Sequence, residues 1–181
     1  LQNVVKAMNL SGIELEDLVF SGLAAFQCLM SDDTKEQGIA LIEIDDNFTT
    51  LSVFYDNVLR GVCVEQKSVI ALNVLERLKG EMNRIRDGRP ISKIILLGSS
   101  YVHEDFIDNV NTVFGIPSHA AYIKNIRGKS KDITNPTYLT SIGASLYGFD
   151  ARARAYGHRE LRFGLIRKAT RRVEEFIDEY F

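Results

Sequence analysis

Residues 41–54 have the sequence Leu-Ile-Glu-Ile-Asp-Asp-Asn-Phe-Thr-Thr-Leu-Ser-Val-Phe, in which two apolar stretches flank a short polar turn. Both stretches have the length of a strand, so we expect strands over Ile39–Ile44 and Thr50–Tyr55. The dipeptide Asp56-Asn57 is a second tight-turn signal, and it leads to a third strand over Leu59–Val64. The sequence therefore predicts a three-stranded meander with two acids in its first turn.

The apolar spacing changes after the meander. Residues 69–85 carry apolar side chains at helical spacing and are followed by Asp87-Gly88, which predicts a helix. Ile91–Leu97 is almost continuously apolar, as expected of a central strand covered on both faces. A last helix over Pro136–Tyr147 is expected to be capped by Asn135 and to end at Gly148. The remaining expected elements are helices over Leu1–Asn9, Gly22–Met30 and Glu104–Phe114, and strands over Glu14–Phe20 and His119–Ile123.

This order of elements predicts the fold class. Three meandering strands, a helix, a buried strand, a second helix and a further strand indicate an α/β, ribonuclease-H-like half-domain with a mixed five-stranded sheet flanked by helices. We assign residues 38–150 to this subdomain. Residues 1–37 are then the end of a preceding lobe or connecting helices, and residues 151–181 are a basic linker and a C-terminal amphipathic helix.

Three motifs in the same order resemble the second half of the actin-like cell-division proteins of the FtsA family. Residues 41–54 resemble the phosphate-2 hairpin of that family, and Gly115-Ile116-Pro117 resembles its Gly-Leu-Pro motif. Residues 135–148 resemble its Asn-Pro-x-Tyr motif and the Ile-Gly and Leu-Tyr-Gly positions that follow. The resemblance covers roughly residues 1–150 and implies the actin and Hsp70 (ASKHA) fold. The related pilus protein PilM is the second choice.

The hairpin departs from the family pattern where phosphate would bind. Asp45, Asp46 and Asn47 replace three glycines, and Thr49 is the loop residue that is retained. Glycines let backbone N–H groups converge on an anion without a Cβ in the way. A carboxylate about 4 Å from a phosphate costs about 4 kcal/mol at a surface-like dielectric. We therefore expect weak nucleotide binding or none.

The adenosine-side motif is also reduced. Leu97-Gly98-Ser99-Ser100-Tyr101 keeps only the first glycine of the family's glycine-rich turn, and residues 66–90 leave room for little more than one helix where the family has an upper lobe. From these departures we expect no enzymatic activity and no cofactor, with binding of ATP and Mg²⁺ as the alternative. The nucleotide-loop positions that we expect to be non-functional are Asp45, Asp46, Asn47, Thr49, Gly98, Ser99 and Ser100.

The C-terminal segment is basic and amphipathic. Residues 151–172 contain eight basic residues and a single acid, Glu160. FtsA-like proteins end in an amphipathic membrane helix, and this ending looks similar, although residues 174–179 carry four acids. Packing on the protein's own core or on another subunit is the alternative. The residues expected on this membrane or partner helix are Leu165, Ile166, Arg167, Lys168, Arg171, Arg172, Phe176, Ile177 and Phe181.

Composition narrows the class of protein. With 45% hydrophobic and 25% charged residues the chain is an ordinary globular sequence, and no apolar run approaches the roughly 20 residues that span a bilayer. Cys28 and Cys63 lie in apolar contexts typical of reduced thiols. The local basic block lacks the spread of a nucleic-acid docking face. We expect a cytoplasmic protein that can also bind peripherally at the inner membrane. Because the first residue is not Met, we also expect a piece of a longer protein.

Three functions remain open at this point. The first is a degenerate FtsA-type scaffold for division or morphogenesis that binds a tubulin-like division protein or an assembly-platform protein and can form homo-oligomers. The second is a PilM-like platform of a pilus or type II secretion system. The third is an active actin-like ATPase whose first lobe lies elsewhere. A metal nuclease built on Glu43, Asp45 and Asp46 is disfavoured, because Asp46 should point away from the other two in a strand.

Overall fold

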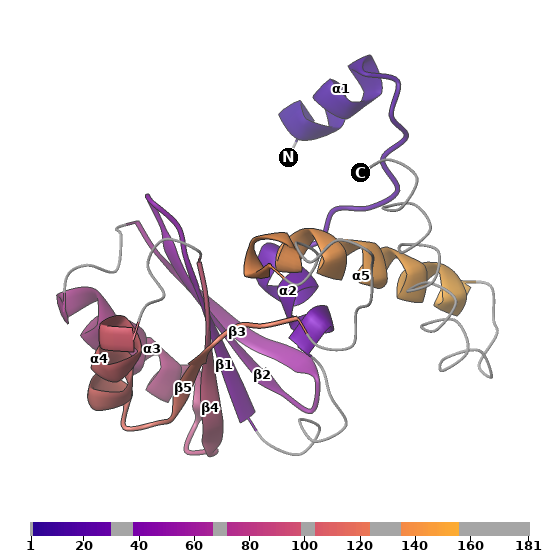
Figure 1. Cartoon of the computed structure of the whole chain (residues 1–181). Helices are drawn as coiled ribbons and strands as arrows, with labels where there is room; N and C mark the ends of the chain where they lie inside the picture. The colour runs from indigo at the N-terminus through magenta and orange to yellow at the C-terminus, as the bar shows by residue number, and fades with distance from the viewer. Residues whose placement is uncertain (1, 30–37, 67–71, 99–103, 124–134, 156–181) are drawn as a thin grey trace.

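The computed structural model describes residues 2–29, 38–66, 72–98, 104–123 and 135–155 (Figure 1). The helices are α1 (Gln2–Leu10), α2 (Ser21–Leu29), α3 (Leu72–Arg86), α4 (Glu104–Phe114) and α5 (Leu139–Ala155), with a 3-10 turn η3 (Pro136–Tyr138) before α5. The strands are β1 (Gly38–Ile44), β2 (Thr49–Tyr55), β3 (Val58–Glu65), β4 (Ile91–Leu97) and β5 (Ser118–Ala120).

The strands form one mixed sheet in the order β3-β2-β1-β4-β5. β1 pairs antiparallel with β2 and parallel with β4, β2 pairs antiparallel with β3, and β4 pairs parallel with β5. This confirms the predicted mixed five-stranded sheet. The second hairpin turn is also confirmed, because Asp56 and Asn57 have φ values of 54° and 60°, as a two-residue turn of this kind requires.

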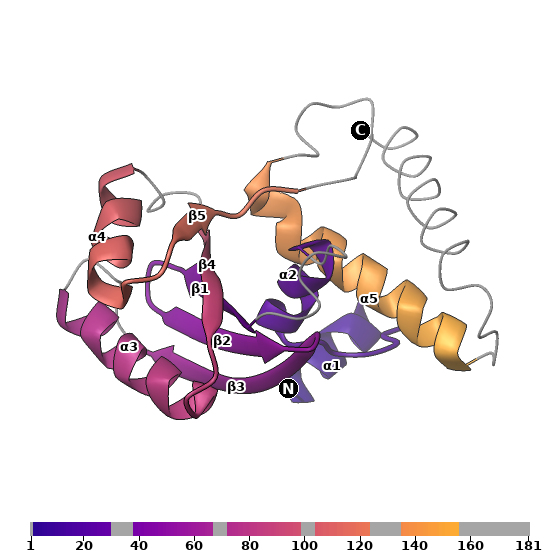
Figure 2. The same ribbon diagram turned by 90° about the horizontal axis from the view of Figure 1, so that it is seen from below.

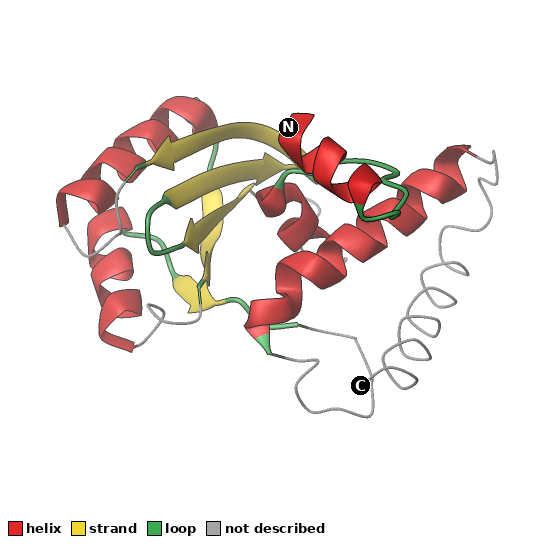
Figure 3. Ribbon diagram, turned by 90° about the horizontal axis from the view of Figure 1, so that it is seen from above, coloured by secondary structure: helices red, strands yellow, loops and turns green. Residues whose placement is uncertain are grey.

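Helices cover both faces of the sheet, with α3 and α4 on one side and α2 and α5 on the other (Figures 1 and 3). Alternate residues of β1 enter the two cores, as the strand period of two demands. Ala40, Ile42 and Ile44 pack with α3 and α4, whereas Ile39 and Leu41 pack with α2 and α5. The central strand therefore has to be apolar at nearly every position.

Helices α2 and α5 pack directly against each other. Gly143 of α5 lies so close to α2 that an added Cβ would overlap the carbonyl oxygen of Ala24. The Cys28 thiol donates a hydrogen bond to the carbonyl oxygen of Leu139 at 3.3 Å. Phe26 of α2 stacks on Phe54 of β2 with ring centroids 3.8 Å apart, which fixes the helix pair on the sheet.

The strand predicted over Glu14–Phe20 is wrong. Residues 13–20 form neither helix nor strand. Leu18 and Phe20 are 42% and 37% exposed, so no neighbouring strand buries the apolar side of this segment. An alternating pattern alone does not make a strand without a pairing partner.

The predicted ends of two other elements are also wrong. β5 is shorter than expected and begins at Ser118. The Asn135 side chain accepts a hydrogen bond from the Thr137 N–H at 3.0 Å, which confirms the cap, but the helix continues past Gly148 to Ala155. A glycine ends a helix when it adopts a left-handed conformation, and Gly148 does not.

The predicted division of the chain at residues 37 and 150 stays a prediction. The C-terminal helix expected around residues 165–181 lies outside the described residues. Within the described part of the chain, no helix combines the length and the apolar character needed to cross a membrane.

Replacing Gly143 with Ala tests the helix contact. The new Cβ would force α2 and α5 apart, so the variant should lose about 1–3 kcal/mol of unfolding free energy in urea denaturation followed by circular dichroism. Gly148→Ala is the matched control, since it lies in the same helix with no atom within 4 Å of an added Cβ, and it should be neutral or more stable by up to about 1 kcal/mol. Equal midpoints for the two variants would contradict the close packing.

Candidate functional site

The two predicted nucleotide loops meet at one edge of the sheet. β1 and β4 are parallel neighbours, with Glu43 beside Leu97, so their carboxyl ends lie together. Gly98 follows β4 with φ 145°, and an added Cβ would lie 2.5 Å from the carbonyl oxygen of Ile44. Only glycine fits this approach of one backbone to another. Ser99 and Ser100 lie outside the described residues.

The β1–β2 turn is closed by its own polar groups. The Asp45 N–H donates a hydrogen bond to the Phe48 carbonyl oxygen at 2.9 Å, and the Asp46 N–H donates to Asp45 Oδ1 at 2.7 Å. Asp45, Asp46 and Asn47 are exposed, whereas Thr49 is fully buried at the start of β2. Two N–H groups that could have faced an anion are therefore used within the turn.

This arrangement does not suit a phosphate group. A phosphate-binding turn presents several backbone N–H groups to the anion and keeps negative charge away. Here the Asp45 carboxylate takes the place of the anion for the Asp46 N–H, and the Asp46 side chain adds a second negative charge at the surface. The described residues of this turn therefore do not fit the phosphates of a nucleotide.

A polar cluster lies just below the turn, on the face of the sheet covered by α2. Glu43 is half-buried near the end of β1, and the Ser21 hydroxyl at the start of α2 donates a hydrogen bond to its Oε2 at 3.0 Å. The Ser52 hydroxyl of β2 is fully buried and has no hydrogen-bond partner among the described residues. Sequence spacing links none of these residues, so the cluster was not predicted.

Gly22 allows α2 to approach this cluster. A Cβ at Gly22 would lie 2.6 Å from Ser52 Oγ, 2.8 Å from a ring carbon of Phe20 and 3.2 Å from Glu43 Oε2. Burial raises the pKa of the Glu43 carboxyl, and the hydrogen bond from Ser21 lowers it to a smaller extent. The cluster thus holds a partly desolvated acid against the first turn of a helix.

The three acids of the nuclease hypothesis are not gathered in one place. Glu43 faces α2, while Asp45 and Asp46 are exposed in the turn. Within the described residues there is no group of three or more His, Cys, Asp or Glu side chains placed to hold a metal ion.

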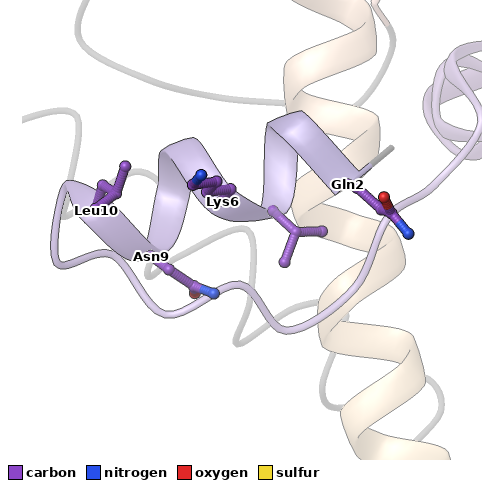
Figure 4. A pocket seen from close by; sticks show the side chains of 5 residues that line it. Gln2, Lys6, Asn9 and Leu10 are labelled. Carbon is purple, nitrogen blue, oxygen red and sulfur yellow. The ribbon is translucent and has the colours of Figure 1, made fainter.

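A shallow hollow lies elsewhere, along α1 (Figure 4). Its lining comes from this one helix and consists of Gln2, Val5, Lys6, Asn9 and Leu10. Side chains from a single helix do not converge on a ligand, so the hollow adds nothing to the site at the sheet edge.

Comparison with known sequences points to cell-division proteins. No family model matches the chain. It is 29% identical over 63 residues to the cell division protein FtsA of Pseudomonas aeruginosa and 37% identical over 64 residues to FtsA of Bacillus subtilis. Each match covers 35% of this chain and no more than 15% of the relative. The chain therefore corresponds to a small part of these proteins.

Comparison with solved structures shows the fold. The structure of the PilM–PilN type IV pilus biogenesis complex matches 81% of this chain and 57% of its own, with a TM-score of 0.63 and 14% identity. The ethanolamine utilization protein EutJ from Carboxydothermus hydrogenoformans matches 80% of this chain and 60% of its own, with a TM-score of 0.55 and 13% identity. The actin-like fold and the predicted resemblance, FtsA first and PilM second, are confirmed.

Glu43 gives the stability a defined dependence on pH. Because the folded protein binds the Glu43 proton more tightly than the unfolded chain does, stability falls as pH rises through the carboxyl range. Glu43→Gln removes this ionisation. The free energy of unfolding of this variant, measured by urea denaturation, should therefore rise relative to that of the unaltered protein between about pH 4 and about pH 7.

Ser21→Ala supplies the matched control for this experiment. It removes the hydrogen bond that favours the ionised form, so the fall with pH should become steeper. A difference between Glu43→Gln and the unaltered protein that stays constant with pH would contradict the assignment.

Proposed function

We propose that this chain, which has an actin-like fold and resembles FtsA over about a third of its length, is part of a protein scaffold that does not hydrolyse ATP. It would recruit cytoplasmic proteins of division or envelope morphogenesis to the inner membrane. Such a scaffold keeps the fold of an ATPase and uses its surfaces for docking.

The β1–β2 turn carries this proposal. An ATPase of this fold needs a turn that accepts phosphate, and here two N–H groups are satisfied inside the turn while two carboxylates are exposed. Gly98 keeps the close backbone contact with Ile44 that the architecture needs. The features that support the fold are thus retained, and those that would hold an anion are replaced.

The proteins that this chain resembles support a role in assembly. FtsA is a cell division protein, and PilM forms a type IV pilus biogenesis complex with PilN. Docking of other proteins is the common element that we carry over to this chain. A tubulin-like division protein is our first candidate for its partner, and a component of an assembly platform is the second.

A PilM-like platform is the alternative scaffold. The structural match to the PilM–PilN complex extends over 81% of this chain, whereas the sequence matches to FtsA cover 35%. The reduced segment between β3 and β4, which holds the single described helix α3, fits either scaffold.

Attachment to the inner membrane rests on the C-terminal sequence. Residues 151–172 carry eight basic residues, and the apolar residues from Leu165 onward are spaced for one helical face. Each basic residue near an anionic surface contributes about 1 kcal/mol, so this block suits attraction to lipid headgroups.

Calorimetric titration of the full-length protein with Mg²⁺-ATP tests the absence of nucleotide binding. We expect a dissociation constant weaker than about 1 mM, because the exposed carboxylates repel phosphate. The triple variant Asp45→Gly, Asp46→Gly, Asn47→Gly should bind at least tenfold more tightly. Asp87→Gly removes an acid from a distant turn where φ is already 47°, and it should change nothing. Micromolar, Mg²⁺-dependent binding by the unaltered protein would show an active ATPase site.

Co-sedimentation with vesicles tests the membrane arm of the proposal. The unaltered protein should pellet with phosphatidylglycerol vesicles and not with phosphatidylcholine vesicles, and deletion of residues 160–181 should abolish pelleting. Replacing Arg167, Lys168, Arg171 and Arg172 with Gln keeps the apolar face and should also abolish it. Equal pelleting of all three proteins would remove the membrane from the proposal.

A further inference from the structure

We draw no further inference here: the strongest candidate, the arm formed by α1 and residues 13–20 on the side of the molecule away from α3 and α4 (Figure 2), exposes apolar side chains such as Leu10, Ile13 and Leu18, and nothing in the structure shows what covers it.

Discussion

Strand β1 is constrained on every side. It has a strand on each edge and helices over each face, so its residues have almost no freedom to be polar. The single acid that it carries, Glu43, comes near its end, where the Ser21 hydroxyl at the start of α2 partly compensates the loss of water. The sheet order, the two cores and the meeting of the β1 and β4 ends all follow from this central position.

The same constraint separates what the sequence could predict from what it could not. The strand over Ile91–Leu97 was predicted correctly, because a strand covered on both faces has an almost continuously apolar sequence that can be recognised. The Glu14–Phe20 strand failed because pairing, which a pattern does not encode, decides whether an alternating segment becomes a strand. Gly148 was misjudged because a glycine permits a helix end without requiring one.

The candidate site shows a similar division. The resemblance located the Asp45–Asn47 turn and Gly98, and the structure places them at the same edge of the sheet. The Ser21–Glu43 contact joins residues 22 positions apart and depends on the approach of α2 at Gly22, which only coordinates reveal. Backbone positions were thus accessible from sequence, and side-chain contacts between layers were not. At this edge the backbone contact of Gly98 with Ile44 is kept, whereas the turn beside it carries two exposed carboxylates.

The crossing of α2 and α5 has a consequence for motion. At the crossing, the absence of a Cβ at Gly143 lets the carbonyl oxygen of Ala24 come close to the backbone of α5. A ratchet of one helical turn, about 5.4 Å, would bring Leu139 or Tyr147 to that position, and neither could be accommodated there. The close contact at Gly143 therefore opposes sliding of one helix along the other. A rearrangement of this half of the molecule would have to move α2 and α5 together as a unit.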